Sequence, residues 1–279
     1  MKANSIVLAI AGFFMFTLMD LSVKWLLNDY SLVQVTFLTC FFAMVGLLAW
    51  TFPNFHLLKT TRPKVHLSRA VLVLFADLLA FYSYGEIEIA QAYTLILTMP
   101  LFTVVLAIGF GYESFNPTRI AVSFVGFIGI LFVLTPGYGA FNIAMLAALG
   151  CAMLEAFTAL VVAHHKDRET PQAFAFYSLS LITLVTGIAS VFSFTPMTFN
   201  AVSISLIGGT SYASGSASVI MAFQKGRPSA ISSIQYSQLL WGLLFGYLIW
   251  GELPEALAIL GGAIVVCSGL FLIRLNNDS

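Results

Sequence analysis

The chain has 279 residues, of which 59% are hydrophobic and only 9% are charged, and its mean hydropathy is +0.96. Soluble domains contain about 45–50% apolar and about 25% charged residues, so this chain has too few polar side chains to cover a surface in water. Twelve Lys and Arg balance twelve Asp and Glu, which leaves no basic field for nucleic acid. The composition excludes a water-soluble fold and a nucleic-acid-binding protein, and it predicts a protein embedded in a lipid bilayer.

Long apolar segments follow one another along the chain, separated by short polar or proline-containing turns. A helix needs roughly 20 apolar residues to cross a bilayer, so about ten spans fit and leave only short loops. The first segment is interpreted as an uncleaved helix, because it is long enough to span and contains Asp20 and Lys24. The sequence thus predicts an all-α polytopic membrane protein of about ten transmembrane helices. The predicted spans are 5–27, 33–52, 69–85, 88–110, 118–135, 143–164, 173–194, 199–223, 229–250 and 255–273.

The basic residues indicate the orientation of these spans. With the N-terminus in the cytoplasm, every Lys and Arg except Lys24 lies on or near the cytoplasmic side, as the positive-inside rule requires. Arg69 is expected to extend to the cytoplasmic headgroups, and His66 lies in the basic loop before it. We therefore expect a multi-pass protein of the plasma membrane, which is the inner membrane in a bacterium, with both termini cytoplasmic.

The sequence contains an internal repeat. Segment 90–113 parallels segment 228–252, and each is followed by a proline-bearing turn, at Pro117 and Pro254. Each repeat unit then holds five spans, and an odd number forces the second unit to enter the membrane upside down. We predict a first five-helix repeat over residues 1–137 and a second, inverted repeat over residues 138–279. Inverted repeats place a binding site near the middle of the bilayer and permit alternating access.

Two segments carry a resemblance to a known family. They are Ala90-Gln91-Ala92 through Pro100-Leu101-Phe102 to Glu113, and Gln235-Tyr236-Ser237-Gln238-Leu239-Leu240-Trp241 through Phe245-Gly246-Tyr247 to Gly251-Glu252-Leu253-Pro254. On these motifs the chain resembles the EamA-type families of the drug/metabolite transporter superfamily along essentially its whole length. The resemblance implies two inverted five-helix halves, a central cavity and transport of a small metabolite. The sequence departs from many relatives at 37–42, where an Arg is absent, and at 84–86, where they carry Ala-Leu-Arg or similar.

Three carboxyl side chains lie inside predicted spans, where an ionisable group is costly and is by default a functional candidate. Asp20 has Lys24 one turn later on the same helix face, so this pair either neutralises itself or takes part in function. Asp77 and Glu155 have no cation within one turn, and Asp77 shares a face with Tyr84 that suits a cationic or amphipathic solute. We predict that Asp77 or Glu155, with Asp20 as a further candidate, couples transport to protons. The alternative is that these acids stay protonated and hold helices together.

Polar residues on the fourth, eighth and ninth spans complete the candidate substrate site. Hydrogen bonding between helices is an equal alternative role for these residues. Pro100 removes a helical bond from the carbonyl of Ile96 and predicts a kink in the fourth span. Gly242 and Gly246 form a GxxxG motif, which serves a homodimer or packing within the chain, so monomer and homodimer stay open. The further substrate-binding candidates are Gln91, Thr94, Tyr212, Gln235, Tyr236, Gln238 and Trp241.

A secondary transporter is the leading functional prediction, with import or export left open. A membrane-embedded enzyme acting on a lipid substrate is the alternative, but it would need clustered carboxylates or histidines at one surface. A channel would need a filter-like backbone segment. The sequence has no Walker or dinucleotide fingerprint, and Cys40, Cys151 and Cys267 lack metal-ligand spacing. We therefore expect a small-molecule substrate and the lipid bilayer as partners, with no catalytic residue, metal or cofactor.

Overall fold

The computed structural model describes residues 3–111, 115–134, 142–165, 169–225, 234–254 and 256–277, and these contain helices and turns but no strand. The expected repeat boundary near residue 137, Glu113 and the repeat segment 228–232 lie outside the described residues. The elements are α1 (Ala3–Leu26), α2 (Leu32–Thr51), the 3₁₀ helix η1 (Phe55–Leu58), α3 (Pro63–Glu86), α4 (Ile89–Ile96), α5 (Met99–Gly109), α6 (Pro117–Leu134), α7 (Ile143–His165), α8 (Pro171–Ser190), α9 (Phe199–Lys225), α11 (Ser237–Trp250) and α12 (Ala256–Asn277).

These helices confirm the prediction of an all-helical polytopic membrane protein. Six helical segments are long and apolar enough to cross a bilayer, and three shorter apolar helices accompany them among the described residues. Most helices begin and end within two or three residues of the predicted spans. Four ends differ by more: α3 begins at Pro63 rather than at residue 69, and α11 begins at Ser237 rather than at residue 229. α8 ends four residues before its predicted end, and α12 ends four residues after it.

The fourth predicted span is broken into α4 and α5, which confirms the kink expected from Pro100. The Leu97 amide still bonds to the Tyr93 carbonyl at 2.8 Å, but the Thr98 amide bonds three residues back, to Leu95, at 3.2 Å. Pro100 has no N–H with which to continue the ladder. The chain therefore makes a turn at residues 97–98 before α5 begins.

The segment before α11 has a second break. Residue 234 is helical, residues 235–236 form a turn, and α11 then begins at Ser237. The Gln238 and Leu239 amides bond to the carbonyls of Gln235 and Tyr236, at 2.9 and 3.2 Å. The two segments that correspond in the sequence repeat are thus interrupted at corresponding positions.

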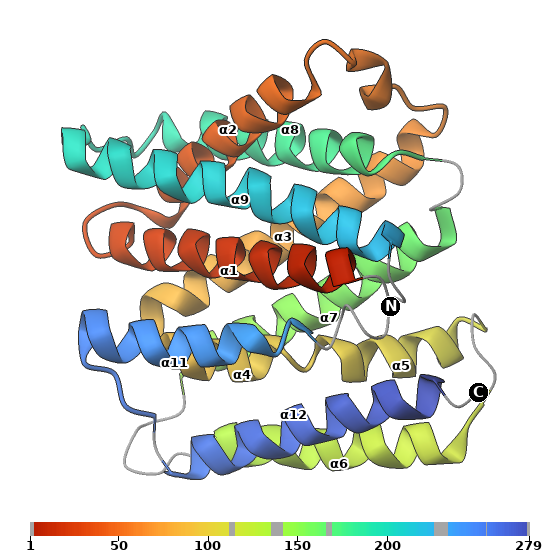
Figure 1. The fold of residues 1–279 in the computed structure, drawn as a ribbon. Helices are drawn as coiled ribbons and strands as arrows, with labels where there is room; N and C mark the ends of the chain where they lie inside the picture. The colour runs from red at the N-terminus through yellow and green to blue at the C-terminus, as the bar shows by residue number, and fades with distance from the viewer. Residues whose placement is uncertain are drawn as a thin grey trace.

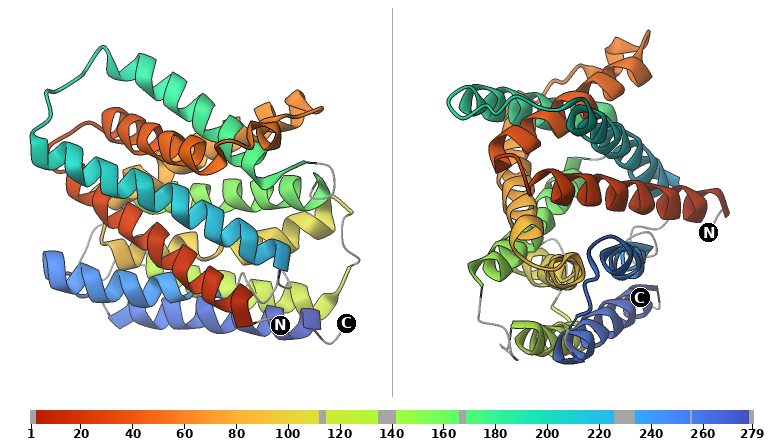
Figure 2. Two further views of the ribbon diagram at one scale, coloured as in Figure 1. Left: turned by 45° about the horizontal axis from the view of Figure 1, so that its top comes forward. Right: turned by 90° about the vertical axis from the view of Figure 1, so that its left-hand side faces the viewer.

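The helices form three groups (Figure 1). α1, α2, α3, α8 and α9 lie together, with α1 packed along α9 and α2 along α8 and α9. α6 and α12 lie side by side along the opposite edge. α4, α5, α7 and α11 lie between these two groups, with α7 packed against α3, α4 and α5, and Figure 2 shows the arrangement from two further directions. The first residues of α1 and the last residues of α12 lie on the same side of the bundle.

Glycines of α9 allow its close packing against α1 and α2. A Cβ added at Gly215 would lie 3.1 Å from the Gly12 carbonyl oxygen of α1, and one at Gly209 would lie 2.4 Å from the Phe42 Cβ of α2. Small residues at helix interfaces let backbones approach closely in membranes. The small-residue stretch of α9 therefore serves helix packing.

Candidate functional site

Asp20 is a buried carboxyl group on α1, with 3% of its surface exposed. The Tyr93 hydroxyl of α4 donates a hydrogen bond of 2.7 Å to its Oδ2 atom, and Tyr84 of α3 also interacts with this carboxyl. The rings of Tyr84 and Tyr93 meet edge to face, with centroids 6.0 Å apart. Burying a carboxyl group is costly unless it is hydrogen-bonded, so the two tyrosines stabilise Asp20 at this position.

Two more carboxyl groups lie near Asp20 on other helices. Asp77 of α3 accepts a hydrogen bond of 3.0 Å from the Tyr212 hydroxyl of α9. Glu155 of α7 interacts electrostatically with both aspartates, while Arg69 contributes a positive charge that acts on Asp77. The structure thus brings together the three acids that the sequence singled out. We refer to Asp20, Asp77 and Glu155 as the carboxyl cluster.

Lys24 does not pair with Asp20, and the expected contact between them is wrong. Its Nζ atom lies 2.7 Å from Glu252 Oε1, just after α11, and donates a hydrogen bond of 2.9 Å to the Ile87 carbonyl. The other Glu252 oxygen accepts the Ile89 amide, the first of α4, at 3.0 Å. Helical spacing favoured Asp20 as the partner of Lys24, but the Asp20 carboxyl accepts a hydrogen bond from Tyr93. The ammonium group of Lys24 instead contacts Glu252 and the Ile87 carbonyl. We call Lys24, Ile87, Ile89 and Glu252 the Lys24–Glu252 closure.

The GxxxG motif packs within the chain. A Cβ added at Gly242 would lie 2.5 Å from Cδ2 of Tyr93, and one at Gly246 would lie 3.1 Å from Cγ2 of Ile89. Ile89 and Tyr93 are one turn apart on α4, so a single face of α4 lies on the glycine face of α11. The structure therefore assigns this motif to the α4–α11 contact.

Several candidate polar groups gather where α11 begins. Tyr236 is 7% exposed, and no partner for its hydroxyl is found within the described part of the chain; the same holds for the buried Ser237 Oγ and Trp241 Nε1 atoms. The Trp241 ring meets Phe14 of α1 edge to face, with centroids 5.3 Å apart. Buried donors normally have partners, so this end of α11 has unused hydrogen-bonding capacity facing α1.

The other predicted binding residues are less well placed to contact a solute. The Thr94 hydroxyl bonds to the Ala90 carbonyl of its own helix, and Thr94 lies against Gly262 of α12. Gln238 is 8% exposed, whereas Gln91 and Gln235 are partly exposed. Tyr93 was missed from the sequence, because it lies in an apolar segment and its partner Asp20 is distant along the chain.

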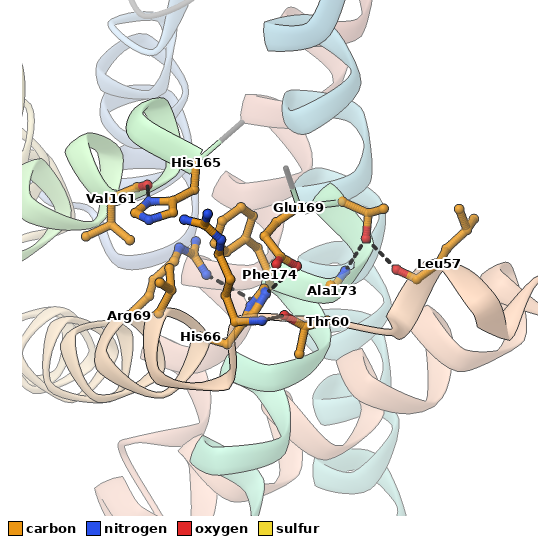
Figure 3. A network of polar contacts seen from close by, with 12 residues as sticks. Leu57, Thr60, His66, Arg69, Val161, His165, Glu169, Ala173 and Phe174 are labelled. Atoms are coloured by element: carbon orange, nitrogen blue, oxygen red, sulfur yellow. Dashed lines mark hydrogen bonds and ion pairs between the residues drawn. The ribbon is translucent and has the colours of Figure 1, made fainter. Parts of the chain in front are cut away.

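A polar network joins the beginnings of α3 and α8 (Figure 3). His66 Nε2 lies 3.0 Å from Glu169 Oε2. The imidazole ring also contacts the rings of Phe174 and Tyr177, with centroids 4.7 and 4.8 Å away and ring planes tilted by 44° and 40°. Burial raises the pKa of Glu169, but hydrogen bonds from His66 and Thr60 outweigh it and hold this pKa below its ordinary value. His66 is therefore a buried residue of α3 rather than part of an exposed basic loop.

Two further contacts belong to this network. Arg69 Nη1 donates to the Phe174 carbonyl at 3.1 Å and to Ser178 Oγ at 2.8 Å, so it does not extend to the headgroups as expected. The Thr170 hydroxyl donates to the Leu57 carbonyl of η1 and accepts the Ala173 amide at 3.1 Å, which caps α8. We call the contacts of His66, Arg69, Glu169 and Thr170 the His66–Glu169 network.

A cavity of about 450 Å³ lies between α3 and α8, where Lys64, Leu67, Tyr177 and Leu184 contribute to its lining. A second, much smaller cavity of about 20 Å³ lies among α2, α8 and α9, beside Trp50. Neither is lined by the carboxyl cluster or by the polar residues of α11.

Comparison with known proteins identifies this fold. Residues 3–135 match the EamA-like transporter family. These residues are an EamA domain. A solved crystal structure has the same fold, with a TM-score of 0.67 over 99% of both chains at 15% sequence identity. The resemblance inferred from the sequence motifs is therefore confirmed.

Several curated relatives of this chain are named as transporters of small metabolites. The S-adenosylmethionine uptake transporter of Rickettsia bellii is 28% identical over 94% of this chain and 92% of its own length. That of Rickettsia felis is 29% identical over 94% and 91%, and the riboflavin transporter of Vibrio cholerae is 28% identical over 77% and 73%. These relatives confirm the prediction of a small-molecule transporter in the membrane.

Proposed function

We propose that this EamA protein transports an organic cation that carries a heterocyclic ring, with S-adenosylmethionine as the representative solute. The observation that carries the proposal is the carboxyl cluster, in which three acids on different helices lie among tyrosine rings. Carboxylates pair with a cationic centre, and aromatic faces also attract cations. S-Adenosylmethionine has a sulfonium cation, an ammonium group and an adenine ring, and the relatives named for it match nearly the whole chain.

The proposed site lies between two inverted repeats, residues 1–137 and 138–279. The paired breaks at 97–98 and 235–236 support this division, since transporters with inverted repeats form their sites where helices are discontinuous. We place the heterocycle near Tyr236 and Trp241, whose polar atoms have no partner in the described residues. The cationic end then lies toward Asp20, on the same helix as Phe14, which contacts Trp241.

The carboxyl cluster also supports coupling to protons. A carboxyl group that exchanges a proton as it binds or releases a cationic solute links the two movements. Asp77 and Glu155 remain the first candidates, and Asp20 the third. The rival possibility is that these acids only bind tyrosines and hold helices in place.

Removing the charge of a cluster acid is expected to lower uptake of radiolabelled S-adenosylmethionine into proteoliposomes by about tenfold or more, equivalent to roughly 1.4 kcal/mol of lost binding. The variants are Asp20→Asn, Asp77→Asn and Glu155→Gln, which keep shape and hydrogen bonding. Under proton coupling, one variant also loses accumulation driven by a pH gradient while it still exchanges solute. Glu86→Gln, which neutralises an exposed carboxyl group, is the matched control. Normal uptake by all three cluster variants would refute the cation proposal, and uptake of riboflavin alone would assign the site to a different solute.

We further propose that both termini are cytoplasmic, because this orientation places all basic residues except Lys24 on or near that side. Single cysteines at Asn54 and Asn142, in a protein without its native cysteines, report the two faces. An impermeant thiol reagent added to intact cells is expected to label position 142 but not position 54. The reverse pattern would overturn the proposed orientation.

A further inference from the structure

Three contacts join α1, α4 and α11 in a column along one face of α4. At one end is the Lys24–Glu252 closure, where Glu252 accepts the first amide of α4. One turn further along α4, Tyr93 donates to Asp20. Between these polar contacts, Gly246 and Gly242 of α11 pack directly on Ile89 and Tyr93. The position of Tyr93 therefore affects both the Asp20 carboxyl and the α4–α11 contact.

The packing leaves little freedom for Tyr93 to move alone. The ring is 2% exposed, Tyr84 lies against it edge to face, and the added-Cβ distances of 2.5 and 2.7 Å from Gly242 to Cδ2 and Cε2 show that α11 touches this edge of the ring. Cores packed this closely change between discrete arrangements rather than by gradual deformation. A change in the hydrogen bond to Asp20 is then transmitted through the ring to α11 and to Ile89.

We propose that Tyr93 is a positioning residue that couples the charge of Asp20 to the Lys24–Glu252 closure, so that a cation bound at Asp20 releases α4 from α11. The identity of that cation rests on the proposed function, whereas the coupling itself does not. A hydrogen bond from a buried hydroxyl to a carboxylate is among the stronger kinds. A cation that binds the carboxylate oxygens of Asp20 competes with the Tyr93 hydroxyl for them. The hydrogen bond that joins α4 to α1 is then weakened.

Other groups face the same carboxyl, so the test must separate their effects from that of Tyr93. Tyr84 and Asp77 of α3 and Glu155 of α7 act on Asp20, and Lys24 follows it on α1. The Asp77–Tyr212 hydrogen bond offers a matched control. It joins the same two kinds of group at 3.0 Å, but its tyrosine belongs to α9 and not to α4.

The experiment measures how fast an impermeant thiol reagent modifies a cysteine at position 89, which is completely buried in the α4–α11 contact. Ile89→Cys is introduced in a background without Cys40, Cys151 and Cys267, and the protein is reconstituted in proteoliposomes. Asp20→Asn leaves Tyr93 a neutral acceptor in place of a charged one, and Tyr93→Phe removes the donor, so each is expected to raise the modification rate by about tenfold or more, because hydrogen bonds to charged groups are the stronger kind. The double variant is expected to react no faster than Tyr93→Phe, because both changes act on the same hydrogen bond. Tyr212→Phe is expected to leave the rate unchanged.

Addition of S-adenosylmethionine is expected to raise the modification rate in the parent but not in Tyr93→Phe. Its binding to both proteins is measured separately by equilibrium binding of the radiolabelled compound. Additive effects of Asp20→Asn and Tyr93→Phe, or an equal rise in Tyr212→Phe, would overturn the coupling and leave Tyr93 a structural residue. If S-adenosylmethionine binds neither protein while the variants behave as expected, the coupling stands and the proposed substrate is wrong.

Discussion

Replacing Lys24 with methionine is expected to destabilise the protein by about 3 kcal/mol or more, because it leaves Glu252 as a buried charge without its partner. The two side chains are only 10% and 16% exposed, and their charged atoms lie 2.7 Å apart. Glu252 also accepts the first amide of α4, so a shift of the unpaired carboxylate toward water disturbs the start of that helix as well. Thermal unfolding in detergent and uptake by proteoliposomes measure the loss.

The partner variant distinguishes a broken charge pair from lost packing. Lys24→Met combined with Glu252→Met is expected to be more stable than Lys24→Met alone, since replacing both members of a buried pair by apolar residues removes the unpaired charge. The exposed Lys59→Met serves as the control, and changes at such surface positions stay within about 0.5 kcal/mol. A double variant that loses the sum of both single effects would show that the pair contributes no interaction energy.

The second large effect is expected from Gly209→Ala, which should lower stability by about 3 kcal/mol, at the upper end for overpacked sites. The added methyl group would lie 2.4 Å from the Phe42 Cβ, 2.7 Å from the Thr39 carbonyl oxygen and 2.9 Å from the Ala43 amide nitrogen. Two of these are backbone atoms, so α2 must move away from α9 as a whole. Thermal unfolding in detergent measures the change.

Gly109→Ala provides the comparison, because an added Cβ there meets nothing within 4 Å. Alanine is the better helix former by up to about 1 kcal/mol, so this variant is expected to match or exceed the parent in stability. If the two alanine variants unfolded at the same temperature, close contact between α2 and α9 at Gly209 would not be needed for stability.

The helices were predictable because bilayer thickness fixes how long an apolar segment must be. Pro100 likewise predicted the break after α4 from local chemistry alone. The start of α3 was missed, since its first turns carry Lys64 and His66 and lack the apolar signal, although they pack against α8. Hydropathy therefore locates the part of a helix that lies in lipid and not the turns that extend beyond it.

The site was harder to predict, since its contacts join residues far apart in sequence. The three acids could be singled out because a carboxyl group in an apolar segment is rare. Tyr93 has no such signal, and the spacing of Asp20 and Lys24 favoured a local pair over the distant Glu252. The partner of a polar side chain depends on which helices become neighbours, and no single segment contains that information.

Two polar contacts lie at opposite ends of α3. His66, near its start, is bonded to Glu169, while Ile87, directly after its last residue, is bonded to Lys24 beside Glu252. A helix of this length separates them by more than about 30 Å, so the free energies of opening the two add independently. The probability that both are open together is then the product of two small numbers. If each contact closes one side of the protein, simultaneous exposure of the interior to both sides is rare, and leakage of ions is suppressed without a separate plug.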